Sequence, residues 1–117
     1  MKRIAILRCL RSNDVCTGAG CMHALNKRKG SFAVYENEDV ELEAYWSCNG
    51  CVDCFLQNQQ GMEEKLERII SLHLDAVHVG VCTRRQNTDG IWERCKIIDS
   101  ICKKLLAEGI KVVEGTH

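Results

Sequence analysis

The sequence predicts an α/β fold in which helices cover both faces of a four-stranded parallel sheet. Four short apolar or alternating runs, typical of strands, take turns with three longer runs whose apolar residues recur at helical spacing. A strand–helix order repeated in this way indicates parallel strands joined by right-handed crossovers. At 117 residues the chain is long enough for one domain with a real core and too short for two. We therefore expect one domain, residues 1–117, built as a three-layer sandwich.

The four expected strands follow from their apolar patterns. Residues 4–7 and 76–82 are almost continuously apolar, as in strands buried on both faces of a parallel sheet. Residues 40–46 alternate apolar and charged side chains, which indicates an edge strand with one face in solvent. Residues 110–113 supply the last strand. We expect these strands in the order 2-1-3-4, as in flavodoxin-like and Rossmann-like folds.

The three expected helices span about residues 18–29, 56–72 and 91–107. The first helix should end before Gly30, because glycine readily takes the left-handed conformation that follows many helix ends. Residues 83–90 are rich in polar side chains and are expected to form a loop ahead of the third helix.

The stretch that carries most chemistry contains three cysteines, Cys48, Cys51 and Cys54, at C-x2-C-x2-C spacing. Each step lets a turn bring successive sulfurs toward one centre, and Gly50 lowers the steric cost of that turn. Backbone amides at the start of the following helix, together with its dipole, favour thiolate over thiol. Because a thiolate is both a metal ligand and a nucleophile, the motif alone leaves metal binding and redox chemistry open.

Charge and composition narrow the possible partners and the possible chemistry of the cysteines. Sixteen basic and sixteen acidic residues give a formal net charge of zero, which argues against nucleic acid or a membrane surface as the main partner. The N-terminal apolar run is too short for a signal peptide, and no stretch approaches the length of a membrane span. We therefore expect a cytoplasmic protein with reduced thiols. Nine cysteines, an odd number that fits a fully paired disulfide framework badly, then point to metal.

The expected topology gathers the cysteines at one edge of the sheet. Cys9, Cys48 and Cys82 each follow the carboxyl end of a different strand, where ligands bind in open α/β sheets. The other cysteines of that edge lie in loops or helix starts: Cys16, Cys21, Cys51, Cys54 and Cys95. We predict that these eight thiolates are metal ligands. Cys102 falls on the apolar side of the third helix, where we expect a buried and inert thiol.

The histidines and arginines are expected to have lesser roles. His78 lies inside the third strand, where a hydrogen-bonded core imidazole is favoured over a ligand. His117 follows the fourth strand at the site edge and is a candidate for an outer-shell group, whereas His23 and His73 are expected on helix surfaces. Three arginines near strand ends could lower thiol pKa values or balance the charge of a metal centre: Arg8, Arg84 and Arg85.

Two kinds of metal centre fit this pattern. A structural zinc ion takes four ligands, and this edge offers about twice that number. The C-x2-C-x2-C spacing also opens ferredoxin-type cluster motifs, although position 58, where their fourth cysteine would stand, is Asn58. We therefore place an iron–sulfur cluster slightly ahead of zinc, for electron transfer with a protein redox partner or for the handling of metal or clusters.

The alternative is a thiol–disulfide oxidoreductase. It would use Cys48 and Cys51 as its dithiol, with Cys54 as the resolving thiol. An oxidised framework of purely structural role fits the length and the odd cysteine count least well. The sequence assigns no catalytic residue.

The order of these motifs resembles that of the CGGC-domain proteins, small prokaryotic proteins named for a central Cys-Gly-Gly-Cys. The matching parts are residues 4–9, Cys16 and Cys21, residues 47–51, Cys82, Cys95 and residues 114–117. The resemblance covers essentially the whole chain and implies metal binding without implying a reaction. The sequence departs from the family pattern at Asn49, which replaces the first glycine, and at Lys96-Ile97, where the family has Pro-His. A potential imidazole ligand is thereby absent, and the additional Cys54 could substitute for it.

Overall fold

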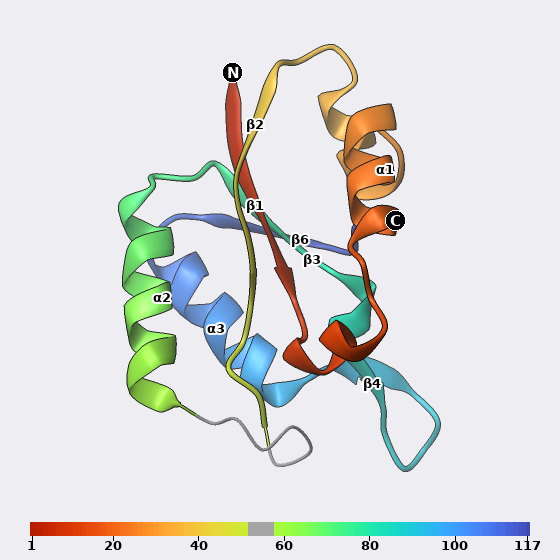
Figure 1. Ribbon diagram of the computed structural model, residues 1–117, viewed down its shortest axis with the longest axis vertical. Helices are drawn as coiled ribbons and strands as arrows, with labels where there is room; N and C mark the ends of the chain where they lie inside the picture. Colours follow the sequence, from red (N-terminus) through yellow and green to blue (C-terminus); the bar gives the residue numbers. More distant parts are fainter. Residues whose placement is uncertain (52–57) are drawn as a thin grey trace.

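The chain forms a three-layer α/β sandwich around a four-stranded parallel sheet, as the sequence predicts (Figure 1). The computed structural model describes residues 1–51 and 58–117. The strands of this sheet are β1 (Lys2–Arg8), β2 (Val40–Ser47), β3 (Ala76–Val79) and β6 (Lys111–Glu114). Their order is β2-β1-β3-β6, which confirms the expected order 2-1-3-4. Because all four strands are parallel, their carboxyl ends lie at the same edge.

The two central strands form the buried middle of the sheet. Residues 4–7 of β1 have no exposed surface, and β3 is buried along its whole length. Successive side chains of a strand point to opposite faces, so Ala5 and Leu7 pack on one side of the sheet and Ile4 and Ile6 on the other. β2 lies at the edge and is mostly half-buried, as its alternating sequence predicts.

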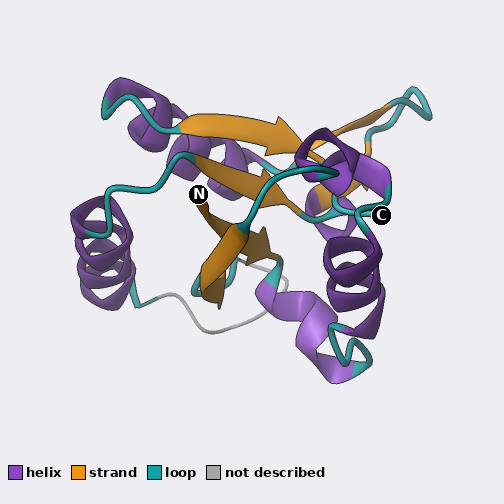
Figure 2. Cartoon of the chain, turned by 90° about the horizontal axis from the view of Figure 1, so that it is seen from above, coloured by secondary structure: helices purple, strands orange, loops and turns teal. Residues whose placement is uncertain are grey.

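Helices cover both faces of the sheet (Figure 2). Helices α2 (Gln59–Ser71) and α3 (Lys96–Ala107) pack against one face, which we call the α2–α3 face. Helix α1 (Ala19–Lys27) and the short 3-10 helix η2 (Gly30–Tyr35) pack against the other, which we call the α1 face. Within the described residues, no helix is long and apolar enough to cross a membrane.

The third strand of the sheet ends at Val79, earlier than its apolar pattern predicts. The Gly80 amide donates to the Leu7 carbonyl at 2.8 Å, and the chain then turns into the 3-10 helix η3 (Val81–Thr83). The side chain of Thr83 holds this turn by donating to the Gly80 carbonyl at 2.6 Å. The prediction was too long because Val81 extends the apolar run although it is exposed.

The third helix begins at Lys96, not at residue 91. Strands β4 (Arg84–Gln86) and β5 (Trp92–Arg94) form an antiparallel hairpin where the sequence predicts a loop and the first turn of a helix. The Asn87 side chain closes the hairpin by accepting from the amides of Asp89 and Ile91, at 2.9 and 3.0 Å. Strands of three residues are too short to give a periodic signal, so the sequence pattern missed them.

Helix α1 ends at Lys27 and is capped by Arg28, not by the glycine that the sequence predicts as its cap. Arg28 itself takes the left-handed conformation, with φ 54°, and its guanidinium donates to the carbonyls of Leu25 and Tyr35. Gly30 meets a different requirement. Its φ is 57°, and a Cβ at this position would lie 2.5 Å from the carbonyl oxygen of Thr116. Only glycine allows the C-terminal segment to approach so closely.

Helix α2 begins after Asn58, whose side chain accepts from the Gly61 amide at 2.8 Å and so caps the helix. Its predicted start at residue 56 lies outside the described residues. Its end at Ser71 agrees with the prediction to within one residue.

His78 is a hydrogen-bonded core imidazole, as its position in a buried strand predicts. Its Nδ1 lies 2.8 Å from Ser31 Oγ, and its Nε2 lies 2.8 Å from the Tyr35 hydroxyl. The Phe32 ring stacks on it at a centroid distance of 4.4 Å. Burial, assisted by the charge of Lys111, lowers the pKa of His78 to about 4. The imidazole therefore ties η2 to the α1 face of the sheet in its neutral form.

Candidate functional site

Three cysteines meet at the carboxyl edge of the sheet, at the ends of three different strands. Cys9 follows β1 and precedes the 3-10 helix η1 (Leu10–Asp14), Cys48 follows β2, and Cys82 lies in η3 after β3. The Cys9 amide lies 3.4 Å from Cys82 Sγ, and the Leu10 amide lies 3.5 Å from Cys48 Sγ. The parallel topology alone predicts that these three cysteines meet at this edge, close enough to share one metal ion. The structure brings them to the edge, but its described residues include no group of three or more donors placed to hold one ion. We call Cys9, Cys48 and Cys82 the strand-end thiols.

Cys9 is the strand-end thiol whose surroundings favour a negative charge. A hydrogen bond from the Cys48 thiol, together with the backbone amides of Arg11 and Ser12, lowers the pKa of Cys9 to about 6, although burial opposes this change. Arg85 Nη2 also lies 3.6 Å from Cys9 Sγ. The same hydrogen bond, together with burial, raises the pKa of Cys48. Cys9 therefore holds the charge of this pair, and Cys48 keeps its proton.

Of the three arginines expected to influence the thiols, Arg85 is the one that donates to a described sulfur. Its Nη1 is buried and has no hydrogen-bond partner among the described residues. Arg84 instead pairs with Glu114 at 3.2 Å, and the Arg8 guanidinium lies 4.9 Å from the centre of the Tyr45 ring. The hairpin that the sequence pattern missed therefore brings a cation to Cys9.

Two further cysteines line a pocket beside the strand-end thiols. Cys51 and Cys95 contribute to a cavity of about 740 Å³ between α2, α3 and the hairpin, and Arg85 lines the same cavity. Cys95 caps the start of α3, where its amide donates to the Thr83 carbonyl at 2.9 Å. Its lining also includes apolar side chains, among them Leu66 and Ile101. Cys51 and Cys95 thus lie on the α2–α3 side of the edge.

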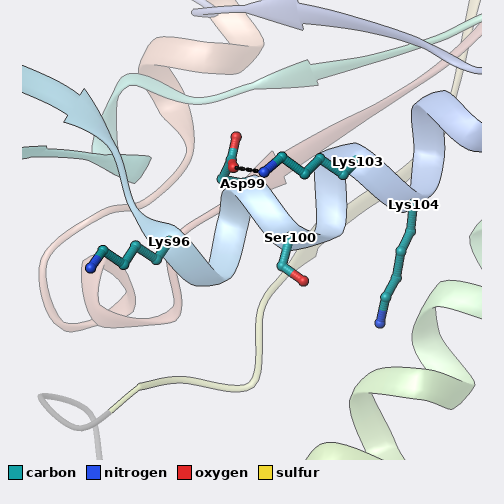
Figure 3. Close-up of a pocket in the computed structure, with 5 residues that line it drawn as sticks. All are labelled: Lys96, Asp99, Ser100, Lys103 and Lys104. Atoms are coloured by element: carbon teal, nitrogen blue, oxygen red, sulfur yellow. Dashed lines mark ion pairs between the residues drawn. The ribbon is translucent and has the colours of Figure 1, made fainter.

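A second pocket, of about 420 Å³, lies along α3 and contains no thiol or imidazole (Figure 3). It is lined by Lys96, Asp99, Ser100, Lys103 and Lys104. An ion pair of 3.1 Å joins Lys103 to Asp99, one turn apart on the helix. Charges spaced in this way are typical of a helix surface that faces water, so this pocket adds nothing to the candidate site.

Cys16 and Cys21 belong to the other side of the sheet. Cys16 Sγ accepts from the Gly18 amide at 3.3 Å, just before α1 begins. Cys21, in the first turns of α1, is buried among the side chains of the α1 face, and its sulfur lies 3.1 Å from Thr116 Oγ1. The described thiols of the predicted set are therefore divided, since Cys48 and Cys95 pack on the α2–α3 face and Cys21 packs on the α1 face.

The two remaining cysteines are Cys54 and Cys102. Cys54 lies outside the described residues, so its predicted role stays a prediction. Cys102 is fully buried between Ile98 and Leu105 on α3, as the sequence predicts, and burial raises its pKa to about 11. A thiol in such surroundings is protonated and inert.

The side chains as they stand are not arranged as a ready metal site. Among the described residues, no group of three or more Cys, His, Asp or Glu side chains is placed to hold one ion, and no two cysteines form a disulfide. The donor chemistry nevertheless fits a thiophilic centre. The strand-end thiols are close together, backbone amides point at their sulfurs, and an unpartnered Arg85 nitrogen lies beside them.

Three residues near the thiols were not among the predicted site residues. Lys65 donates to the Ser47 carbonyl at 3.0 Å, and burial lowers its pKa although the neighbouring Cys48 opposes this change. The Ser12 amide faces Cys9, and Thr116 contacts Cys21 from the far end of the chain. Of the three, only Thr116 could have been found from the sequence, because it stands in the closing Gly-Thr-His that matches the family pattern.

The fold and the site together define an α/β protein with thiols gathered at the carboxyl ends of its parallel strands. The chain belongs to the CGGC-domain family, whose model matches residues 3–117. It is 33% identical over 123 residues to the uncharacterized protein MJ0582 of Methanocaldococcus jannaschii, in an alignment that covers 98% of this chain and 86% of that protein. No solved structure matches. Membership of this family, with so many cysteines, suggests metal binding and does not identify the metal.

Proposed function

We propose that the protein holds a thiolate-ligated metal centre at the carboxyl edge of its sheet. The proposed ligands are drawn from Cys9, Cys16, Cys21, Cys48, Cys51, Cys54, Cys82 and Cys95. The observation that carries the proposal is the juxtaposition of the strand-end thiols, with the amides of Cys9 and Leu10 directed at sulfur. Packing gives no reason for three strands to end in neighbouring thiols.

The surroundings of the strand-end thiols suit a centre with negative charge. Four thiolates around a zinc ion or an iron–sulfur cluster leave a net negative charge, and the Arg85 guanidinium beside Cys9 would offset it. Amides directed at sulfur, such as those of Cys9 and Leu10, are among the groups that set the potential of iron–sulfur clusters.

We keep the iron–sulfur cluster slightly ahead of zinc, because the thiols outnumber the four ligands that one zinc ion takes. A bound cluster would supply one-electron chemistry, and the role would be electron transfer or the handling of metal or clusters. We propose a reducing compartment such as the cytoplasm, because thiolate ligation of a metal requires reduced cysteines.

Anaerobic purification followed by elemental analysis tests the proposal. A cluster gives iron, acid-labile sulfide and visible absorbance, whereas zinc gives metal without colour. Cys48→Ser and Cys51→Ser should each lose most of the bound metal, because an alcohol replaces a thiolate ligand. Cys102→Ser is the matched control and should keep its metal, since its thiol lies in the core. Unchanged metal content in both Cys48→Ser and Cys51→Ser would remove the central motif from the site.

A second candidate function, thiol–disulfide exchange, is favoured by the hydrogen bond between Cys9 and Cys48. The Cys9 thiolate would attack a disulfide R–S–S–R and release one R–S⁻. Cys48, after losing its proton, would attack the mixed disulfide, form the Cys9–Cys48 bond and release the second R–S⁻. This assignment pairs Cys48 with Cys9, where the sequence suggested Cys51. Peptide mapping of metal-free protein treated with oxidised glutathione tests it, and the absence of a Cys9–Cys48 disulfide would dismiss it.

A further inference from the structure

We propose that Glu114 is a positioning residue of the strand-end site, and that it holds the hairpin of β4 and β5 so that Arg85 reaches Cys9. Glu114 is the last residue of β6, at the carboxyl edge of the sheet. This inference rests on the proposed function in one respect, that Arg85 serves a metal centre at the strand-end thiols. It goes beyond that function by naming the residue that fixes where Arg85 lies.

The hairpin has little apolar packing to hold it against the domain. It projects from the carboxyl edge of the sheet (Figure 1). Each residue of β4 and β5 is exposed or half-buried, and even Trp92 leaves 61% of its surface exposed. A hairpin of two strands is at best marginally stable by itself in water. Polar contacts must therefore fix its orientation relative to the sheet.

The register of the hairpin sets two arginines side by side on one of its faces. Arg84 of β4 lies directly opposite Arg94 of β5. Like charges in opposite positions destabilise an antiparallel pair of strands. Because successive side chains of a strand point to opposite faces, Arg85 projects from the other face of the hairpin. The hairpin thus carries an arginine pair on one face and the arginine of the strand-end site on the other.

Glu114 neutralises the arginine pair and ties it to the sheet. Its Oε2 lies 3.2 Å from Arg84 Nη1, and its Oε1 accepts from Arg94 Nε at 2.6 Å and from Nη2 of the same guanidinium. One carboxylate therefore joins both strands of the hairpin to the end of β6. Arg94 has a second carboxylate partner, Asp99, at 3.3 Å. Loss of Glu114 would therefore release mainly Arg84, and with it the strand that carries Arg85.

The position of β4 decides whether Arg85 meets the thiols. Arg85 Nη2 donates to Cys9 Sγ at 3.6 Å, which is a long contact that a small tilt of the strand would break. The base of the hairpin is fixed independently of Glu114, because the Cys95 amide donates to the Thr83 carbonyl at 2.9 Å. The ion pair with Glu114 adds a second fixed point one residue before Arg85. Glu114 therefore acts on the site through the guanidinium of Arg85.

Nuclear magnetic resonance relaxation of metal-free, reduced protein tests whether Glu114 holds the hairpin. In Glu114→Gln, residues 84–86 should gain backbone motion while β1 does not. The motion should appear either as order parameters that fall from about 0.85 toward about 0.6, or as relaxation dispersion from slower exchange. Glu108→Gln, which changes an exposed carboxylate at the other end of α3, is the matched control and should behave as the parent does. Glu114 is itself exposed, and exposed ion pairs add little to stability, so the variant is expected to fold. Unchanged relaxation of β4 in Glu114→Gln would overturn the inference.

Zinc(II) binding in competition with a chelator tests whether Glu114 acts through Arg85. Glu114→Gln and Arg85→Gln should each weaken zinc binding about ten-fold, which is the usual effect of a change beside the ligands. Arg85→Gln/Glu114→Gln should bind zinc as Arg85→Gln alone does, because the second change has nothing left to displace. Effects that multiply in the double variant would show another route and overturn the inference. A parent chain that binds no zinc and carries no metal after anaerobic purification would defeat the proposed function, whereas the relaxation measurement separately decides whether Glu114 fixes the hairpin.

Discussion

Lowering the pH should destabilise the folded protein through one buried side chain, His78. The imidazole is fully buried, both ring nitrogens have hydrogen-bond partners, and its pKa is lowered to about 4. In the unfolded chain the same group titrates near 6.5. Between these two values the unfolded state binds the extra proton. Stability is therefore fully present above about pH 6.5 and is lost as the pH falls toward 4.

The magnitude follows from the two pKa values. Their difference corresponds to about 3 kcal/mol in total, of which about 2 kcal/mol is lost between pH 7 and pH 5. For a domain whose whole stability is on the order of 10 kcal/mol, this loss is large enough to measure by urea unfolding.

The assay compares parent protein with His78→Gln, both free of metal and reduced, in urea at pH 7 and at pH 5. The remaining histidines and the carboxylates are common to both proteins, so the difference in pH dependence isolates His78. The parent should lose about 2 kcal/mol more than the variant. Equal losses in both proteins would refute the reasoning. If His78→Gln does not fold, the nuclear magnetic resonance titration of the parent decides, since a His78 ring that protonates above pH 5.5 contradicts the buried neutral imidazole.

Two further predictions concern single thiols. In metal-free protein, the ultraviolet absorbance of thiolates should reveal one thiol that titrates with a midpoint near pH 6, because hydrogen bonds stabilise the thiolate form of Cys9. At pH 7 the Cys9 thiol would then be about nine-tenths ionised. Cys48→Ala should move this midpoint upward, and an unchanged titration would show that Cys48 does not stabilise the charge. Cys102→Ala should keep its full metal content and cost on the order of 1 kcal/mol of unfolding free energy, because it removes one sulfur from a packed core. Metal loss in a folded Cys102→Ala protein would place α3 inside the site.

The parallel sheet could be predicted because its signals are local and repeated. The apolar runs of residues 4–7 and 76–79 and the alternation of residues 40–46 each identify a strand without knowledge of the rest of the chain. The hairpin of β4 and β5 could not be predicted in this way. Its strands have three residues each, and its turn depends on hydrogen bonds from the Asn87 side chain.

The site was partly predictable for a related reason. Strand ends of a parallel sheet share an edge, so Cys9 and Cys82 could be brought together although 73 residues separate them. No comparable rule predicts the face of the sheet on which a loop or helix packs. Cys16 and Cys21 were placed at the correct edge, but their burial on the α1 face depends on the contacts of Cys21 with Thr116 and the surrounding apolar cluster. The reach of Arg85 to Cys9 likewise depends on the hairpin.

The central claim, that the strand-end thiols hold a metal centre, is tested most directly by X-ray absorption spectroscopy of the anaerobically purified protein. Sulfur scatterers at about 2.3 Å from the metal are expected for thiolate ligation. The account predicts such a shell in the parent protein and a clear fall in its sulfur count, or in bound metal, for Cys9→Ser/Cys48→Ser. A first shell of only nitrogen and oxygen, or a sulfur shell that is unchanged in the double variant, would contradict it.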